Sequence, residues 1–181
     1  MAVELLINPA IFEINNHEII TLAACLFFNS VIAQTTVESK RYGTLQFVEL
    51  DYGLAKVVGR EVEASDKTPT GTHGWLEDFV IVDVTDSIRV LPQANFGVVY
   101  MVKAIDTVEI DVDIEWIYPE KITNEKGKGF TSIKYTTKRP TNIPSASSYN
   151  LDAPYEMVRG NWAMNIYLEN KKVYSKTFFL Y

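Results

Sequence analysis

The chain has 181 residues, the length of one domain, and its hydrophobic content of 47% is enough to bury an ordinary core. Seventeen basic and 23 acidic residues give a net charge of −6, and the basic residues are scattered, which argues against a nucleic-acid partner or an anionic membrane surface because both need a concentrated cationic footprint. Aromatic and β-branched residues are plentiful, and segments with helical spacing are missing after the N-terminus, so an all-β domain is predicted.

The N-terminus reads as an export signal. Residues 19–33 (IITLAACLFFNSVIA) form an apolar run shorter than the roughly 20 residues that cross a bilayer as a helix. We predict a signal peptide over residues 1–33, cleavage after Ala33, and a single periplasmic or secreted bacterial domain over residues 34–181. Residues 1–18 lack the Lys or Arg that export signals carry, which a misassigned start codon would explain.

Two alternatives for the leader stay open. Leu22 to Cys25 (LAAC) looks like the lipobox of bacterial lipoproteins, in which the cysteine is acylated, although Phe27 and Phe28 continue the apolar run where a lipoprotein would turn polar. A retained anchor or a buried N-terminal helix is the other alternative. After cleavage the domain has no cysteine, so its stability must come from burial and strand pairing.

The first half of the predicted domain contains strands separated by turn residues. Gly53 divides two strand-like segments and suits a turn or a bulge. Residues 65–74 (SDKTPTGTHG) are a loop by composition. The candidate strand 96–105 is apolar enough to be central and buried on both faces. The candidate strands are 44–52, 54–62, 79–90 and 96–105.

The clearest strand is 108–116, where hydrophobic and acidic residues alternate without exception. This period of two puts one face in the core and four carboxylates on the other. The carboxylates belong to Glu109, Asp111, Asp113 and Glu115.

Calcium could use this acidic row if a loop added backbone carbonyls. Regular strands do not converge their side chains on an ion, so a solvated face is favoured, and a surface for a cationic partner is the alternative. The next strand, 133–139, carries Lys134 and Lys138 on one face, and these lysines would face the carboxylates if the two strands pair.

Residues 119–129 and 139–154 are predicted loops, the second long and rich in Ser and Pro. The chain ends with a predicted β-hairpin, formed by residues 157–168 and 173–180 around a polar turn. About seven to nine strands without crossover helices predict an immunoglobulin-like antiparallel β-sandwich.

Several motifs resemble one bacterial family. They are Tyr42-Gly43, FGVVY at 96–100, YNLD at 149–152, EMVRGNW at 156–162 and the terminal segment 171–178. That family is catalogued only as a domain of unknown function and is usually exported. The resemblance covers most of the chain after Gln34 and implies a fold, but it implies no activity, cofactor or catalytic residue.

No motif predicts catalysis, a metal or a cofactor. His73 is the only histidine after the leader, and no Gly-x-Ser-x-Gly elbow accompanies it. One histidine without cysteine argues against zinc. Carboxylate pairs for glycoside hydrolysis are permitted by the number of acids, without positive support.

The aromatic residues divide into two groups. Trp116 and Trp162 lie on apolar strand faces, which predicts core packing. Trp75 follows a Gly-rich loop and Tyr149 lies in the Ser-rich loop, so both are candidates for exposed ligand contacts.

The leading prediction is a non-catalytic module that binds or supports an unidentified protein or envelope component. A glycan- or small-ligand-binding module using loop aromatics is the first alternative, and a carboxylate-based hydrolase the second.

Overall fold

The computed structural model describes residues 35–181, except for the side chains of Arg60 and of residues 75–78. The predicted signal peptide and the lipobox at Cys25 lie outside the described residues. Among the residues described, none of the helical segments has the length and hydropathy needed to cross a membrane.

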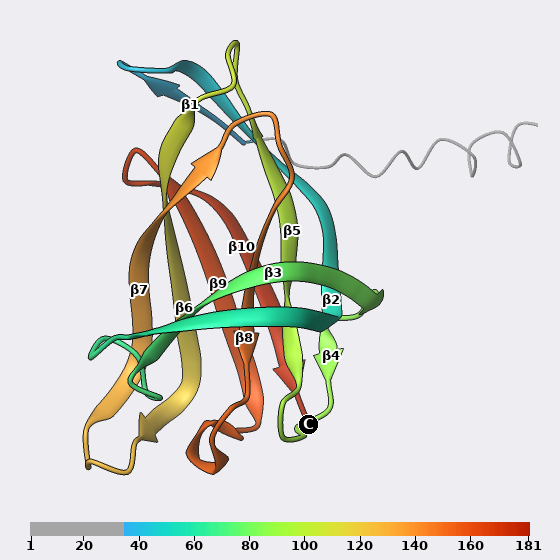
Figure 1. Cartoon of the computed structure of the whole chain (residues 1–181), viewed down its shortest axis with the longest axis vertical. Coiled ribbons are helices and arrows are strands. Elements are labelled where there is room, and N and C mark those ends of the chain that lie inside the picture. Colours follow the sequence, from blue (N-terminus) through green and yellow to red (C-terminus); the bar gives the residue numbers. More distant parts are fainter. Residues whose placement is uncertain (1–34) are drawn as a thin grey trace, which may run out of the picture. The chain divides into compact units, whose positions relative to one another are not determined.

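Ten strands form two sheets in residues 35–181 (Figure 1). The first sheet has the order β1-β2-β5-β8, with β3 also paired to β2, and the second has the order β4-β10-β9-β6-β7. The strands are β1 (Thr35–Ser39), β2 (Gly43–Ala64), β3 (Thr72–Asp83), β4 (Ser87–Ile88), β5 (Asn95–Lys103), β6 (Glu109–Thr123), β7 (Gly129–Pro140), β8 (Ser145–Asn150), β9 (Gly160–Leu168) and β10 (Lys171–Leu180), with a 3₁₀ turn, η1 (Pro154–Glu156), before β9.

The predicted antiparallel β-sandwich is confirmed. The only parallel pair among the described strands joins β10 to β4, which is two residues long and too short to produce a periodic signal. The count of ten therefore slightly exceeds the expected seven to nine.

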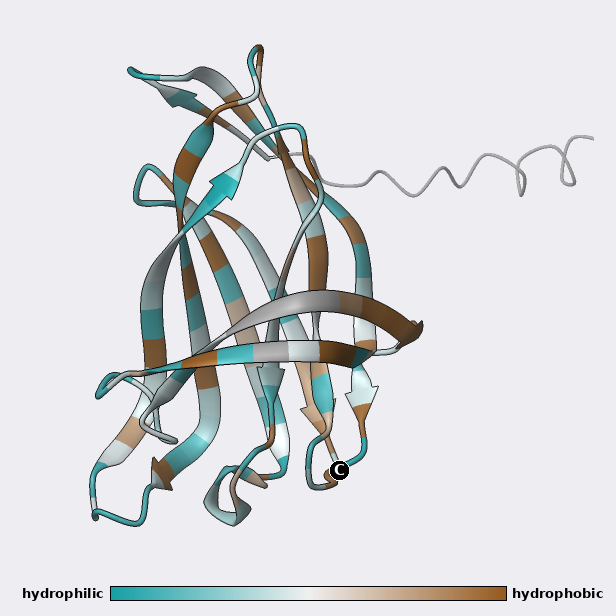
Figure 2. Cartoon of the chain, in the orientation of Figure 1, coloured by the Kyte–Doolittle hydropathy of each residue, from teal (hydrophilic) through white to brown (hydrophobic). Residues whose placement is uncertain are grey.

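Alternating residues of the strands build the core, and Figure 2 shows the alternation along the ribbons. In β6, Ile110, Val112, Ile114 and Trp116 are at most 1% exposed, whereas the acids between them face outward. Trp162 on β9 is fully buried as well. The core positions predicted from the period of two are thus confirmed.

The β2 strand is continuous, so the prediction of two strands with a possible turn between them is corrected. Gly53 has a φ of +141°, and a Cβ there would lie 2.0 Å from the carbonyl oxygen of Asp83; a bulge follows directly, between Leu54 and Ala55 in the pairing with β3. Only glycine accepts this combination of backbone conformation and close approach. The strand bends through the bulge without ending.

Beyond the bulge, β2 leaves its partner β5 and pairs with β3. Residues 46–55 of β2 pair with β5, whereas residues 54–64 pair with β3. We call residues 55–81 the β2–β3 arm. In Figure 1 the arm crosses the view in front of β8, while the strands of the sandwich run up and down it.

Two predicted loops are partly wrong. The β6 strand continues to Thr123, and its register shift between Ile117 and Ile122 accommodates Pro119. The Ser-rich segment contains β8, an edge strand paired with β5. Serine has no strong strand preference, so the partner strand decides this assignment. The terminal hairpin is confirmed as β9 and β10.

Candidate functional site

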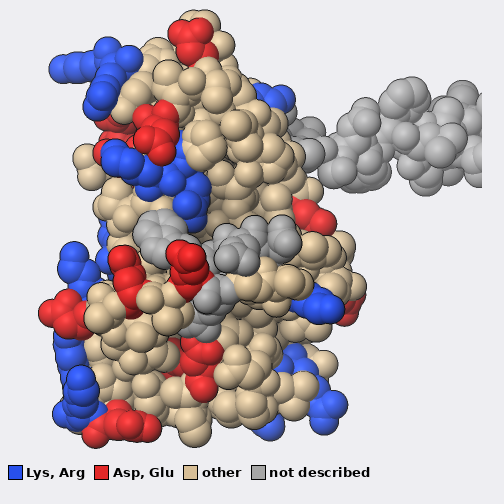
Figure 3. Space-filling view, in the orientation of Figure 1, with Lys and Arg blue, Asp and Glu red and all other residues tan. Residues whose placement is uncertain are grey.

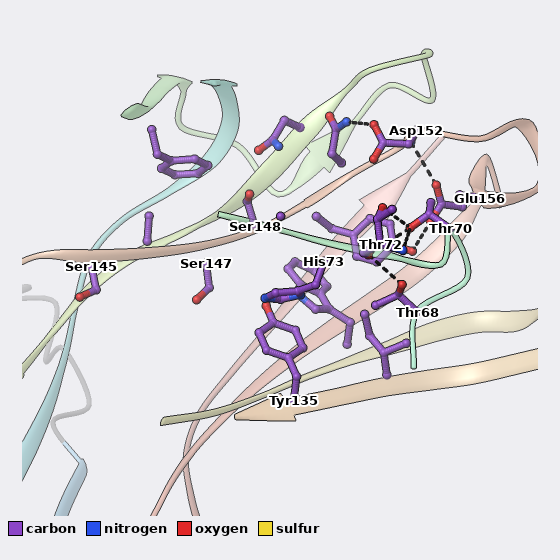
Figure 4. Close-up of a pocket in the computed structure, with 18 of the residues that line it drawn as sticks. Thr68, Thr70, Thr72, His73, Tyr135, Ser145, Ser147, Ser148, Asp152 and Glu156 are labelled. Atoms are coloured by element: carbon purple, nitrogen blue, oxygen red, sulfur yellow. Dashed lines mark hydrogen bonds between the residues drawn. The ribbon is translucent and has the colours of Figure 1, made fainter. Parts of the chain in front are cut away.

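A cavity of about 470 Å³ lies beside β7 and β8, the edge strands of the two sheets, and beneath the tip of the β2–β3 arm. We call it the arm cavity (Figure 4). Its walls come from the arm (68–74), from β7, from β8, from Trp116 on β6, and from the loop that carries Glu156. Segments that are distant in sequence therefore meet around one space.

Hydrogen bonds hold the tip of the arm to the rest of the sandwich. The Pro69 carbonyl accepts from the Tyr155 hydroxyl and from Nδ2 of Asn124, both at 3.2 Å. Lys128 Nζ donates to the Asp66 carbonyl at 2.6 Å. Contacts on two sides thus fix the roof of the arm cavity.

The His73 ring packs edge-on against the Tyr135 ring of β7, with centroids 4.4 Å apart. Figure 4 shows Tyr135 pointing from β7 towards His73 beneath the arm. His73 falls in the segment predicted to be a loop (65–74), but it is half-buried on β3 and lines the arm cavity.

Glu156 forms one end of the arm cavity and is 1% exposed. Its carboxylate accepts from the Tyr149 hydroxyl at 2.6 Å and from the backbone N–H groups of Asp152 and Ala153 at 3.1 and 3.0 Å. Burial raises the pKa of Glu156, although the Tyr149 hydroxyl and the backbone donors act in the opposite direction. Glu156 therefore holds the loop after β8 in place.

Tyr149 corrects the sequence-based expectation of an exposed loop aromatic. It lies on β8, is 7% exposed, and packs edge-on against Trp116 and Trp162. Its hydroxyl also lies 3.2 Å from the hydroxyl of Tyr118. The strand pairing of β8 turns this side chain into the core.

At the other end of the arm cavity is a polar recess, which we call the donor recess. Its wall residues are Trp116, Tyr135, Arg139 and Ser147, and Tyr100 lies behind them. Trp116 is fully buried and Ser147 is 4% exposed. Within the described chain, Trp116 Nε1 and Ser147 Oγ have no partner of full hydrogen-bond geometry, although the Tyr135 hydroxyl lies near Trp116 and the Tyr100 hydroxyl near Ser147.

The Tyr100 hydroxyl extends the same polar cluster. It is fully buried and has no partner of hydrogen-bond geometry within the described chain. Burial raises the pKa of Tyr100, while the nearby Ser147 hydroxyl and the positive charge of Arg139 lower it. Burial also raises the pKa of Tyr135. Both phenols are therefore neutral at physiological pH and able to donate.

The acidic row is largely neutralised by its neighbours. Lys138 lies 2.9 Å from Asp111, while Asp113 accepts from the Thr136 hydroxyl at 2.7 Å and lies 3.6 Å from Lys134. The predicted facing of lysines and carboxylates across β6 and β7 is confirmed.

The two end members of the acidic row behave differently. Glu115 accepts from Asn165 at 3.0 Å and from the Tyr167 hydroxyl at 2.6 Å, whereas Glu109 is exposed. Burial alone would raise the pKa of Glu115, but these hydrogen bonds and the charge of Lys134 hold it below its ordinary value.

No metal site emerges from this row. Among the side chains that the structure describes, no three His, Cys, Asp or Glu residues are grouped so as to hold a metal ion. Figure 3 shows acidic and basic side chains interspersed on the face that carries the arm.

Trp75 occupies a position on β3 opposite Glu61, and its side chain lies outside the described part of the structure. Its role as a ligand contact stays a prediction. The donor recess was not foreseen, because Arg139 and Ser147 lie in segments with no sequence motif and meet only through the packing of β7 and β8.

The two packed sheets place the chain in the class of immunoglobulin-like β-sandwiches. The crystal structure of an immunoglobulin-like protein from Pseudomonas aeruginosa is similar to it, with a TM-score of 0.50 and 13% identity over 70% of this chain and 96% of that chain.

The chain belongs to the family described as a domain of unknown function (DUF3859), whose sequence profile matches residues 47–180. This membership confirms the resemblance seen in the sequence motifs. None of the curated proteins matches the chain.

A Pseudomonas fluorescens alkylpurine DNA glycosylase, AlkC, is similar over 52% of this chain and 27% of that protein. Its identity is 12% and its TM-score 0.35, too low for any conclusion about the present chain.

Proposed function

We propose that this domain is a non-catalytic binding module and that the arm cavity receives part of another macromolecule. The supporting observation is that buried polar atoms without a partner of full hydrogen-bond geometry line the cavity within the described chain. They are Trp116 Nε1, Ser147 Oγ and Asn95 Oδ1.

Such atoms are costly, because a buried polar group without a hydrogen bond costs about 1–3 kcal/mol. Native proteins retain few of them, and their presence calls for an explanation. A binding partner that supplies the missing hydrogen bonds is such an explanation. The cavity volume of about 470 Å³ also falls in the range of ligand sites.

The titratable groups of the cavity support binding more than catalysis. Both carboxylate oxygens of Glu156 accept hydrogen bonds that hold its own loop. The His73 ring is packed against Tyr135. With the predicted signal peptide, the partner would be a protein or another component of the cell envelope.

A cavity-filling variant tests this proposal. Ser145 lines the cavity, is half-buried, and projects from the same side of β8 as Ser147 (Figure 4). We expect Ser145→Tyr to block the site. Ser175→Tyr is the matched control, because Ser175 is an exposed strand residue on β10 and is not part of the cavity wall.

The measurement is retention of envelope proteins and glycans from the source cell by the immobilised full-length chain. A partner held by the wild type and by Ser175→Tyr should be lost with Ser145→Tyr. Equal retention by a correctly folded Ser145→Tyr variant would place binding elsewhere and contradict the proposal.

A second candidate is a glycan-binding site. The hydroxyls of Thr70 and Thr72 line the arm side of the cavity, and the Tyr135 ring lines the β7 side, a combination that suits sugar hydroxyls and sugar faces. Specific retention on an array of oligosaccharides, lost with Trp75→Ala, would favour this candidate. Uniform absence of binding across the array would reject it.

A further inference from the structure

The β2–β3 arm joins the sandwich at one base. There the backbone of Gly53 lies against the backbone of Asp83 and Thr85. The ladder between β2 and β5 ends at Ala55, and among the described strands β3 pairs only with β2. Movement of the arm about this base, as one hairpin, therefore breaks no ladder hydrogen bond of the sandwich.

Little apolar packing holds the arm against the sandwich. Among the side chains that the structure describes, the buried core and the hydrophobic residues packed against it include Leu54 at the base but no hydrophobic residue of the arm. Val58, Val62 and Val80 of the arm are more than half exposed. Segments with few buried apolar contacts open at a lower free energy than the core. The position of the arm over the cavity thus depends on polar contacts.

Polar contacts hold the tip of the arm. The Pro69 carbonyl accepts from the Tyr155 hydroxyl and from Asn124 Nδ2. The Asp66 carbonyl accepts from Lys128 Nζ. We call these hydrogen bonds the latch. Each runs from a side chain of the sandwich to a backbone carbonyl of the tip, so the latch can break while every strand stays paired.

The tip has a second set of hydrogen bonds that lie within the arm. The Thr68 hydroxyl donates to the Thr72 carbonyl at 2.7 Å, and the N–H of Ser65 donates to the Gly71 carbonyl at 2.8 Å. These bonds do not involve the sandwich. Release of the latch would therefore lift a formed hairpin and leave its tip folded.

The arm covers the outer face of β5. Phe96 and Val98 face the core, so Asn95 lies on the opposite face of the strand. Asn95 is nevertheless only 5% exposed, and it lines the arm cavity together with Phe79 of the arm. In Figure 1 the arm passes over this face of the sheet. The burial of Asn95 therefore depends on the closed position of the arm.

We propose that the arm is a latched lid, which lifts about its base while the sandwich stays folded and clasps the macromolecular partner of the cavity against β8. A segment inside the cavity lies between Thr70 and Thr72 of the arm and Ser148 of β8 (Figure 4). It contacts both walls only in the closed state, so its binding favours closure. This inference rests on the proposed function and specifies how access to the site is regulated.

Thiol labelling of the unliganded full-length chain tests the lid. Cys25 is the single cysteine, so Cys25→Ser provides a background without thiols. Asn95→Cys then places a thiol beneath the arm, and Val112→Cys places one in the core, where the side chain is fully buried. We expect Asn95→Cys to react with a maleimide at least about 100-fold faster than Val112→Cys. The first thiol needs only an open lid, whereas the second needs an unfolded sandwich.

Release of the latch provides a second measurement. Tyr155→Phe combined with Lys128→Met removes two latch donors and keeps the size of both side chains. Labelling of Asn95→Cys should become about tenfold faster, because each lost hydrogen bond shifts the equilibrium by a few-fold to about tenfold. Labelling of Val112→Cys should not change, which separates lid opening from a loss of global stability.

The matched control for the latch variant is Tyr181→Phe combined with Lys171→Met. Both residues are exposed and lie outside the cavity walls. This control should leave the labelling rate of Asn95→Cys unchanged.

A reversible crosslink tests the clasp. Asp66→Cys and Lys128→Cys can be joined by a cleavable bismaleimide, since the Lys128 side chain already reaches the Asp66 carbonyl. The probe is the envelope extract, and the readout is the partner whose retention is lost with Ser145→Tyr. We expect closure before addition of the extract to reduce retention at least about tenfold, and cleavage of the crosslink to restore it.

The outcomes separate the lid, the clasp and the proposed function. Equal labelling of Asn95→Cys and Val112→Cys, or no acceleration in the latch variant, would overturn the lid. These measurements use no ligand, so they can fail while the Ser145→Tyr comparison still supports the binding cavity. Undiminished retention after closure would overturn the clasp. Equal retention by the wild type and Ser145→Tyr would overturn the proposed function and the clasp with it.

Discussion

Replacement of Glu156 tests whether one buried carboxylate holds its end of the arm cavity. Glu156→Ala removes the acceptor of three hydrogen bonds, from the Tyr149 hydroxyl and from the N–H groups of Asp152 and Ala153. Tyr149 is buried, so its hydroxyl is not rescued by water, although it still lies near the Tyr118 hydroxyl. Asp152 and Ala153 are half-buried.

The magnitude follows from these contacts. An unsatisfied buried donor costs about 1–3 kcal/mol of stability, and removal of the buried Glu156 charge offsets part of this cost. We therefore expect Glu156→Ala to lower the free energy of unfolding by about 2–4 kcal/mol at pH 7. Glu156→Gln keeps an acceptor for the backbone donors, and its amide can donate to the Tyr149 hydroxyl. It should stay within about 1 kcal/mol of the wild type.

The pH dependence gives an independent readout. Burial raises the pKa of Glu156, so the folded protein binds this proton more tightly than the unfolded chain. The resulting stabilisation is complete below the ordinary pKa of about 4.5 and is lost as the pH rises through the folded-state pKa. Glu156→Gln removes this loss, so its stability relative to the wild type should increase from pH 4.5 upwards.

Urea unfolding followed by circular dichroism between pH 4 and pH 8 measures both effects. A Glu156→Ala variant within about 0.5 kcal/mol of the wild type would refute the structural role of the carboxylate. A Glu156→Gln variant whose stability difference from the wild type does not change with pH would refute the raised pKa.

Three further predictions address the sheets. Gly97→Ala should destabilise the domain by about 3 kcal/mol and lower the Tm by roughly 6–12 °C, because its Cβ would lie 2.3 Å from the backbone carbonyl oxygen of Ser147; an unchanged Tm would show that β5 and β8 can separate at little cost. Glu115→Gln should reduce the loss of stability on acidification, since the pKa of Glu115 is lowered and its stabilisation is present above about pH 4.5 and lost below it; identical acid unfolding curves for variant and wild type would contradict this. Lys138→Met should leave the Tm unchanged despite the 2.9 Å contact with Asp111, because exposed ion pairs contribute little to stability. A clear drop in Tm would show that this ion pair stabilises the fold.

The strands that face the core were predictable from the sequence. In β6, one face of hydrophobic residues and one of acids indicate burial on a single side. The lysines of the next strand were expected to face these acids on the condition that the two strands pair, and β6 and β7 do pair. Trp116 and Trp162 were predicted to be buried for the same reason. The terminal hairpin was also predictable, because polar turn residues separate two alternating segments.

Other features depended on partners that are distant in the chain. The Ser-rich segment around Tyr149 becomes β8 only because β5 offers an edge to pair with, and this pairing buries a ring expected in solvent. The β2 strand was divided in the prediction because Gly53 signals a break. In the structure Gly53 allows the close approach of Asp83, and the strand continues through a bulge between Leu54 and Ala55 into the arm.

The sequence by itself thus determined the all-β class, the core faces of the main strands and the family, because hydrophobic periodicity and short motifs are properties of neighbouring residues. Only the tertiary structure decided the course of the arm and the existence of the donor recess. Arg139, Ser147 and Trp116 lie on three different strands, and their polar groups face one space because two sheet edges and the arm meet there. That arrangement depends on long-range packing, which no local pattern encodes.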